Sequence, residues 1–159
     1  MKLIYIANSR IPTNKAHGFQ IMKMCEAFSN AGINIELWLP RRFNPIKESP
    51  FEYYGIRENF KIRKIPVIDL IPLSGFLGPV ANFIESMSFA FFMLFHLPIA
   101  GDAVFYSRDQ FILWFLSFSN RKFAYEVHTF PRKPKFHKRI WRKAHKIITI
   151  TNGLKDLII

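Results

Sequence analysis

The N-terminal segment constrains the fold of this chain more than any other stretch. Residues 2–7 form a short run of apolar, aromatic and β-branched residues, which is typical of a buried strand. A polar loop with Pro12 follows, and from Ala16 apolar residues recur every three or four positions, which indicates one face of a helix. Gly32 stands just after this face, where helices commonly end in a left-handed residue. The chain is therefore expected to begin with a strand, a loop and a helix.

The start of this first helix is a candidate anion site. The first N–H groups of a helix lack intrahelical partners and lie at the positive end of the helix dipole. Gly18 would let an anion approach the backbone, so a phosphate site at residues 16–19 is one interpretation. A strand–helix junction with an incidental glycine is the other. The three spaced glycines of the nicotinamide-dinucleotide fingerprint are absent, because Gly18 is the only glycine between Ala7 and Gln20.

Strand-like and helix-like segments alternate along the rest of the chain. Further strands are expected at residues 33–39, 60–67, 103–106, 122–127 and 146–150. Helices are expected at residues 79–97, 109–118, 135–145 and 152–159, with loops at 41–59 and 68–78. This alternation predicts an α/β fold with a doubly wound, mainly parallel, Rossmann-like sheet. A chain of 159 residues is long enough for one such domain with a proper core, so we expect a single domain over residues 1–159.

Polar side chains follow several of the expected strands. Ligands of doubly wound sheets bind outside the carboxyl ends of the strands, so these side chains define a candidate crevice. Asn8 follows the first strand, and Arg108 lies in the Ser-Arg-Asp sequence that follows the fourth. The candidate site residues are His17, Gly18, Arg108, Glu126, His128 and Thr151.

The chain is strongly basic, with a formal net charge of +12. Residues 132–146 contain eight Lys and Arg and no acidic residue, which favours an anionic partner such as nucleic acid, an anionic membrane or a phosphorylated substrate. A solvated helix face is the other interpretation. The aromatic residues lie mainly in apolar periodic runs rather than among Lys and Arg, so no nucleic-acid partner is expected. We predict that residues 135–146 contact an anionic membrane surface.

Two further features restrict the class of protein. Cys25 is the only cysteine and lies on an apolar helix face, which predicts no disulfide and a reducing compartment. The apolar run before Asn8 is too short for a signal peptide, so we expect a cytoplasmic location, with peripheral membrane contact through the basic run. The five histidines show no zinc-site spacing, so no metal is expected. The helix at residues 79–97 is predicted to be buried or to lie at an interface rather than to span a membrane, with Phe91, Phe92 and Phe95 against a second domain, a partner or lipid.

Four stretches of the sequence carry a resemblance to a known family. They are TNKAHGFQIMKMCEAF at residues 13–28, AVFYSRD at 103–109, FAYEVHTFP at 123–131 and KIITITNGLKDLI at 146–158. In these motifs, their order and their spacing, the chain resembles the N-terminal domain of GT-B glycosyltransferases of family 4. In that family two Rossmann-like domains face each other across a cleft. The N-terminal domain mainly holds the acceptor, and the C-terminal domain holds most of the nucleotide through a pair of glutamates.

The resemblance implies roles for several residues. Gly18 matches the glycine near the donor diphosphate, and His128 matches the histidine beside the transferred sugar. Glu126 and Arg108 match less constrained polar positions. The implied activity is transfer, with retention, of a sugar from a nucleotide-diphosphate donor to a glycan or lipid-linked envelope precursor. The donor is a substrate, and no cofactor is implied.

The chain departs from the family in having no C-terminal domain after Ile159. We therefore expect either a fragment of a longer enzyme or a half that needs a separate partner chain, and expect the fragment alone to be inactive. The alternative function is a non-catalytic basic α/β module that binds an anionic membrane or nucleic acid.

Overall fold

The computed structural model describes residues 1–70, 75, 78–131 and 134–158. The elements in chain order are β1 (Lys2–Ile6), α1 (Ala16–Asn30), β2 (Asn34–Pro40), α2 (Pro50–Tyr54), β3 (Lys61–Ile65), α4 (Pro79–His96), the short 3-10 helix η2 (Pro98–Ala100), β4 (Ala103–Ser107), α5 (Gln110–Leu116), β5 (Phe123–Val127), α6 (Pro134–Lys143), β6 (Lys146–Thr149) and α7 (Asn152–Ile158).

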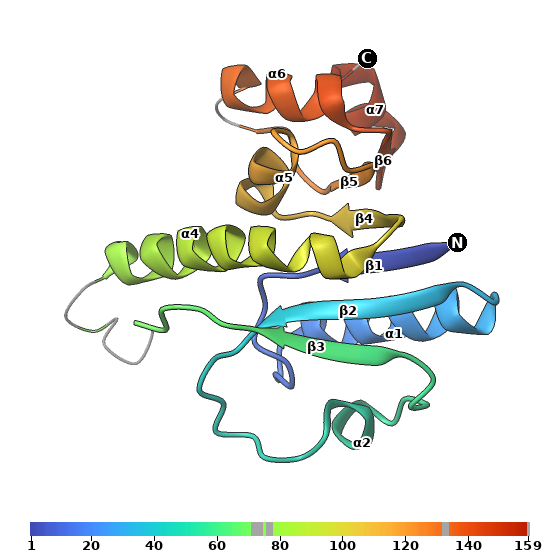
Figure 1. Ribbon diagram of the computed structural model, residues 1–159, viewed down its shortest axis with the longest axis vertical. Coiled ribbons are helices and arrows are strands. Elements are labelled where there is room, and N and C mark those ends of the chain that lie inside the picture. The colour runs from blue at the N-terminus through green and yellow to red at the C-terminus, as the bar shows by residue number, and fades with distance from the viewer. Residues whose placement is uncertain (71–74, 76–77, 132–133, 159) are drawn as a thin grey trace.

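The strands form one parallel sheet (Figure 1). Six strands lie in the order β3-β2-β1-β4-β5-β6. Each neighbouring pair is parallel, from Glu36 opposite Lys61 in β2 and β3 to Glu126 opposite Ile148 in β5 and β6. The strand order reverses between β1 and β4, because the chain builds one half outward to β3 and then crosses back through α4. The predicted doubly wound, Rossmann-like sheet is confirmed, and β1 and β4 flank its topological switch point.

Helices cover both faces of the sheet and separate two cores. Successive side chains of a strand point to opposite faces, so β1 contributes to both cores. On one face Ile4 packs in a core with Phe89 of α4, and α5 and α6 add further apolar residues to that core. On the other face Tyr5 packs in a core with Ile21 of α1. Because β1 is buried on both faces, its sequence is a continuous apolar run rather than an alternating one.

The ends of the helices follow local capping chemistry. Gly32 follows α1 with φ +77°, and its N–H donates to the Ser29 carbonyl oxygen at 2.9 Å. Pro79 occupies the first turn of α4, where no intrahelical N–H is needed. Asp109 caps α5, since its Oδ1 accepts hydrogen bonds from the N–H groups of Phe111 at 2.9 Å and Ile112 at 3.1 Å. The capping aspartate therefore leads directly from the end of β4 into α5.

The prediction of an uninterrupted loop at residues 41–59 was wrong, because this stretch contains α2. The signal is a capping box: the Ser49 side chain accepts from the Phe51 N–H, and the Glu52 side chain accepts from the Ser49 N–H. Gly55 then ends the helix in the left-handed region at φ +59°. Within the predicted connection at 68–78, residues 71–74 and 76–77 lie outside the described residues. The inward packing predicted for Phe136 concerns a side chain that is not described either.

A buried polar cluster ties α4 to the ends of β1 and β2. The guanidinium of Arg42, which follows β2, donates through Nε to Glu85 Oε1 at 2.7 Å and also pairs with Oε2. A third bond joins it to Asn8 Oδ1 at 2.5 Å, and Asn8 Nδ2 donates to Ser86 Oγ at 2.9 Å. Glu85 is only 1% exposed. In the described part of the chain, no helix, α4 included, is long and apolar enough to cross a membrane. The cluster fixes the crossover helix at the switch point.

We predict that Glu85→Ala destabilises the fold strongly. The substitution leaves the Arg42 guanidinium, 12% exposed, without its carboxylate, and losing one partner of a buried ion pair costs about 3–5 kcal/mol. Urea unfolding followed by far-UV circular dichroism measures the change. The control is Glu26→Ala, which breaks the exposed Lys23–Glu26 pair and should have a much smaller effect. Equal effects for the two variants would contradict a structural role for the buried pair.

Candidate functional site

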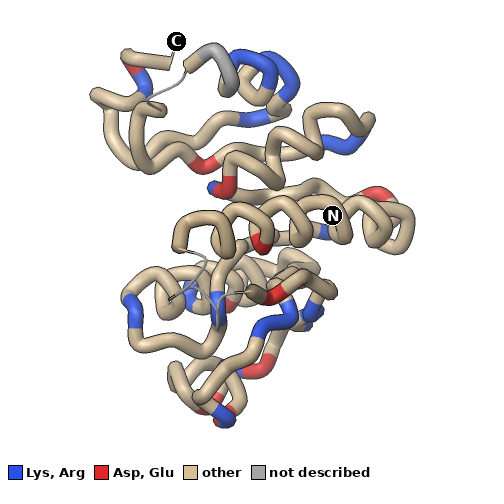
Figure 2. The backbone as a smooth tube through the Cα atoms, turned by 90° about the vertical axis from the view of Figure 1, so that its left-hand side faces the viewer, with Lys and Arg blue, Asp and Glu red and all other residues tan. Residues whose placement is uncertain are grey.

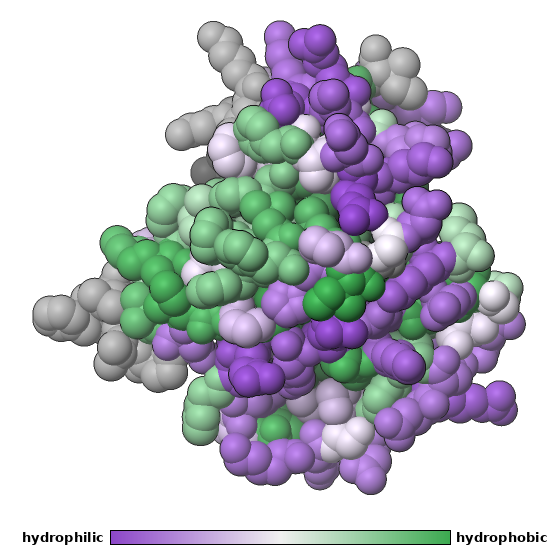
Figure 3. Space-filling model, in the orientation of Figure 1, coloured by the Kyte–Doolittle hydropathy of each residue, from purple (hydrophilic) through white to green (hydrophobic). Residues whose placement is uncertain are grey.

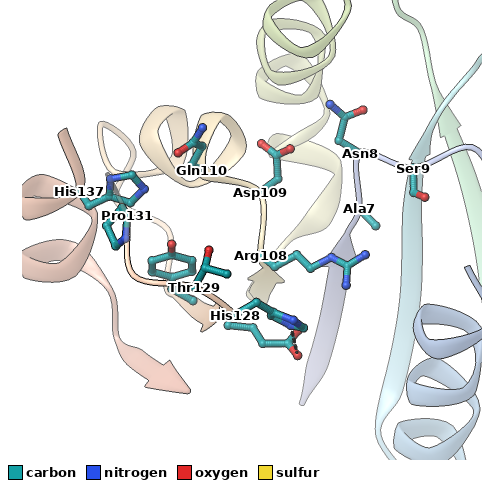
Figure 4. A pocket seen from close by; sticks show the side chains of 12 residues that line it. Ala7, Asn8, Ser9, Arg108, Asp109, Gln110, His128, Thr129, Pro131 and His137 are labelled. Carbon is teal, nitrogen blue, oxygen red and sulfur yellow. Dashed lines mark hydrogen bonds and ion pairs between the residues drawn. The ribbon is translucent and has the colours of Figure 1, made fainter. Parts of the chain in front are cut away.

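The main pocket lies at the carboxyl ends of the central strands (Figure 4). It has a volume of about 430 Å³ and lies beside the switch point between β1 and β4. We call it the crevice pocket. Most of its polar lining comes from three strand ends: Asn8 and Ser9 after β1, Arg108, Asp109 and Gln110 after β4, and Glu126, His128 and Thr129 at the end of β5. Three of the six predicted site residues, Arg108, Glu126 and His128, therefore meet in one pocket.

Glu126 and His128 form a hydrogen-bonded pair in the crevice pocket. His128 Nε2 lies 2.8 Å from Glu126 Oε1, and the carboxylate side chain is 6% exposed while the imidazole is 30% exposed. An ionised carboxylate can only accept, so Nε2 carries the proton and Nδ1 of the neutral ring is an acceptor. The second carboxylate oxygen, Oε2, is buried without a hydrogen-bond partner. An unpaired buried oxygen is costly, and because Oε2 is closed to solvent, the member of this pair that the pocket exposes more is the His128 imidazole.

Two tyrosines lie beneath this pair. The rings of Tyr5 and Tyr106 pack edge to face with their centroids 4.8 Å apart. Burial raises the pKa of both hydroxyls, and the Glu126 carboxylate raises it further. The nearby Arg108 guanidinium acts in the opposite direction on both pKa values. Both tyrosines therefore remain neutral hydroxyls over the physiological pH range, next to a carboxylate and a guanidinium of opposite charge.

A second, basic pocket adjoins the first and shares Asn8 and Ser9 with it. We call it the basic pocket; it has a volume of about 350 Å³. Its basic lining consists of Arg10, Lys15, His17 and Arg42, and no acidic residue belongs to the described lining. His17 and Lys15 belong to the start of α1, whose Lys15 cap makes no side-chain capping bond. An uncapped helix N-terminus among cations is a favourable place for an anion.

The polar groups that line the basic pocket differ in whether they already have hydrogen-bond partners within the fold. The Arg42 guanidinium is engaged by Glu85 and Asn8, so its charge is largely neutralised within the fold. Ser9 Oγ and Arg10 Nε are buried and have no hydrogen-bond partner. Ser9 is 6% exposed and lines both pockets. Both atoms are closed to solvent, so the fold leaves their hydrogen-bonding capacity unused, whereas that of Arg42 is used.

Gly18 has a packing reason for lacking a side chain. A Cβ at this position would overlap the Tyr54 hydroxyl and would lie 2.5 Å from the Thr13 Cγ2 methyl. That hydroxyl accepts from the Thr13 N–H at 2.7 Å and donates to the Thr13 carbonyl oxygen at 2.7 Å. The Gly18 N–H donates to the Lys15 carbonyl oxygen at 3.0 Å. The glycine therefore admits Tyr54 to the loop that carries the basic pocket, and it is buried rather than part of the described pocket lining.

Thr151 lies outside the described lining of the two pockets. Its Oγ1 accepts from the Leu154 N–H at 3.3 Å, which is a helix-capping contact at the start of α7. The basic helix α6 lies at one end of the molecule, where Figure 2 shows Lys and Arg along the backbone. Arg132 and Lys133 of the predicted basic run are outside the described residues. Among the described side chains of α6, His137 alone lines the crevice pocket, where it stacks near Tyr125 with ring centroids 6.5 Å apart.

Several residues of the site were not among the predicted ones: Ser9, Arg10, Lys15, Arg42, Tyr106 and His137. Their positions depend on loop paths and on sheet order, which the local pattern does not specify. Ser9 and Arg10 could have been predicted from the sequence, because they directly follow Asn8 at the end of β1.

Within the described residues, no group of three or more His, Cys, Asp or Glu side chains could hold a metal ion. No protein-family model matches the chain, and no curated protein matches its sequence. The chemistry of the site must therefore be argued from the two pockets themselves. They place a histidine–carboxylate pair beside a cationic cavity, which suits a polar ligand with one neutral and one anionic part.

We predict that a diphosphate in the basic pocket raises the pKa of His17. In the free protein desolvation lowers the pKa of His17, and the Arg108 and Lys15 charges lower it further. The unfolded chain then binds more protons than the folded one, so free-protein stability rises with pH between the folded and the ordinary pKa. A bound anion favours the imidazolium, so pyrophosphate affinity should increase as the pH falls through this range.

The measurement is the pH titration of the His17 Cε1–H resonance by NMR, with and without saturating pyrophosphate. Arg108→Ala is the electrostatic control and should raise the pKa of His17 without any ligand. His17→Gln should remove the pH dependence of pyrophosphate affinity contributed by this ring. An identical His17 titration with and without the anion would place the diphosphate elsewhere.

Proposed function

We propose that this chain is the N-terminal, acceptor-side half of a GT-B glycosyltransferase similar to family 4. The enzyme transfers a sugar, with retention, from a nucleotide-diphosphate donor to an acceptor such as a glycan or a lipid-linked envelope precursor. A second domain, encoded beyond Ile159 or carried by a partner chain, holds most of the nucleotide. We assign the reaction to the cytoplasm, where sugar nucleotides are available.

The observation that carries this proposal is the juxtaposition of the two pockets at the switch point. The crevice pocket supplies groups that can bind a hydroxyl, namely the hydrogen-bonded pair of His128 and Glu126. The basic pocket supplies Arg10, Lys15 and His17 at the start of α1. A sugar linked to a diphosphate has the same two-part chemistry. The shared wall of Asn8 and Ser9 lets one ligand occupy both pockets.

The proposed roles follow from the charges that change during transfer. When the bond between the sugar and the diphosphate breaks, negative charge grows on the leaving phosphate. The α1 N-terminus and the cations of the basic pocket stabilise that charge. His128 Nδ1 faces away from the Glu126 bond and accepts a hydrogen bond from a hydroxyl of the transferred sugar. Glu126 holds the ring in that tautomer, and Arg108 supplies a cation between the two pockets.

The alternative, a non-catalytic basic module, explains less of the structure. It accounts for the exposed cations of α6 but gives no role to the His128–Glu126 pair, which lines the crevice pocket together with Arg108. If the affinity for oligonucleotides falls steeply as salt is raised and the affinity for sugar nucleotides falls less, the basic module is favoured. If the affinity for sugar nucleotides falls more steeply than that for oligonucleotides, the transferase half is favoured.

We predict that His128→Ala, in the protein with both domains, lowers turnover on the order of a hundredfold or more, because the variant loses the contact with the reacting sugar. Nucleotide affinity should change little, because the second domain holds the nucleotide. The melting temperature should fall moderately, because the buried Glu126 carboxylate loses a hydrogen-bond partner, but by too little to explain the loss of turnover. Radiolabelled sugar transfer, nucleotide titration and thermal unfolding are measured on the same preparation.

His145→Ala is the matched control for this experiment. His145 is exposed, and its backbone N–H bond to the Phe123 carbonyl oxygen at 2.8 Å survives the substitution. Near-normal turnover in His128→Ala, or a loss equal to that of His145→Ala, would remove His128 from the reaction. Lost activity that tracks lost melting temperature would assign His128 a purely structural role.

A further inference from the structure

Large apolar side chains remain exposed on the outer side of the helices that cover one face of the sheet. Phe91 and Phe95 of α4 are 49% and 62% exposed, Ile99 of η2 is 61% exposed and Phe118 after α5 is 57% exposed. Figure 3 shows the corresponding apolar region over α4 and α5. We call these four residues the apolar face. Exposed apolar groups gathered on one side of a domain mark an interaction surface.

The apolar face continues from α4 to α5 through a shallow apolar groove, and ring contacts pack the aromatic residues of each helix together. The rings of Phe91 and Phe95 pack edge to face with centroids 5.2 Å apart, and those of Trp114 and Phe118 do so at 4.7 Å. A shallow apolar groove between them is lined by Leu94, Trp114, Phe115 and Phe118. The two helices therefore present one surface rather than separate exposed residues.

Arginines border this surface. The Arg139 guanidinium carbon lies 3.8 Å from the centroid of the Phe118 ring, and the same group donates to Ser117 Oγ at 3.0 Å and to the Ser117 carbonyl oxygen at 3.2 Å. Arg121 donates to the carbonyl oxygens of Gly101 at 2.5 Å and Leu97 at 3.1 Å. Both cations are held against the apolar face by the fold, with side-chain charge at its edge.

The basic side of α6 extends this cationic border. Lys138, Arg142 and Lys143 are exposed on α6, next to the anchored Arg139. The sequences of α5 and α6 contain no acidic residue. Figure 3 shows hydrophilic side chains above the apolar region, at the end of the molecule where Figure 1 places α6. Apolar and cationic groups thus lie side by side on one side of the domain.

The combination fits an anionic lipid surface better than two other occupants. A second copy of the chain would bring another formal charge of +12 against the first, which opposes self-association. Nucleic acid needs open aromatic faces for base stacking. Here Arg139 already covers the Phe118 ring, and Phe91 and Phe95 pack against each other. Anionic phospholipid accepts apolar side chains at the acyl boundary and cations at the headgroups.

We propose that the outer side of α4, α5 and α6 docks onto an anionic phospholipid bilayer, with Phe91, Phe95 and Phe118 entering the interface and the α6 cations contacting headgroups. The docking surface covers a face of the sheet, whereas the crevice pocket opens at the carboxyl edge of its strands. The crevice therefore stays open beside the membrane. Docking is independent of the proposed transfer reaction.

Vesicle flotation of the full chain tests this proposal, with vesicles of phosphatidylcholine alone or mixed with phosphatidylglycerol. Phe95→Ser should lower partitioning onto mixed vesicles about tenfold, because an apolar ring no longer enters the interface. The matched control is Phe43→Ser on the loop after β2, where Phe43 is 63% exposed, and it should leave partitioning unchanged. Phe95→Trp keeps the apolar group and should retain binding, which separates docking from folding.

The contribution of the charges is tested with two double variants that have the same net charge as each other. Arg142→Glu with Lys143→Glu should abolish binding at low salt, whereas Arg57→Glu with Lys61→Glu, at exposed positions far along the sheet, should largely preserve it. Equal losses in the two pairs, equal losses in the two Phe→Ser variants, or equal binding to neutral vesicles would overturn the proposal. So would a dimer in sedimentation velocity, or a DNA complex, that Phe95→Ser abolishes.

Discussion

The ion pair between Arg42 and Glu85 is the constraint on which the arrangement of the candidate site depends. It joins the loop after β2 to the crossover helix α4, and through Asn8 it also fixes the loop after β1. Those two loops and the start of α4 surround the switch point of the sheet. A buried ion pair offers little net stability over apolar packing, but it specifies one arrangement strongly because each charge is costly without its partner. Here that arrangement is the one that leaves room for both pockets.

Polar residues near the crevice divide into those that the fold uses and those that it leaves open. Asn8 forms hydrogen bonds with Arg42 and with α4. Asp109 accepts hydrogen bonds from the start of α5. Both residues therefore shape the pocket through bonds within the fold. Ser9 Oγ, Arg10 Nε and Glu126 Oε2 remain buried without partners. A fold that pairs most of its buried polar atoms makes such exceptions informative. Residues with such unpaired atoms line both pockets.

The sequence predicted the fold more completely than the site. Apolar periodicity and glycine or proline at helix ends are local signals, so the alternation of elements predicted a doubly wound, mainly parallel sheet, but not its strand order. Strand ends likewise brought Arg108, Glu126 and His128 together. Gly18 was chosen from the start of the first helix and Thr151 from the end of a strand, and each has a structural role: one admits Tyr54 and the other caps α7. Arg42 was missed because its partner Glu85 lies 43 positions away, beyond the reach of any local pattern.

We propose that one sugar nucleotide spans the crevice pocket and the basic pocket. The most direct measurement is an NMR titration of the isotope-labelled chain with a panel of nucleotide-diphosphate sugars, compared with the matching free nucleotides and with pyrophosphate. We expect pyrophosphate to perturb the resonances of Arg10, Lys15 and His17 only. A sugar nucleotide should also perturb those of Glu126 and His128. Perturbations confined to the exposed cations of α6, or none at either pocket with any sugar nucleotide, would contradict it.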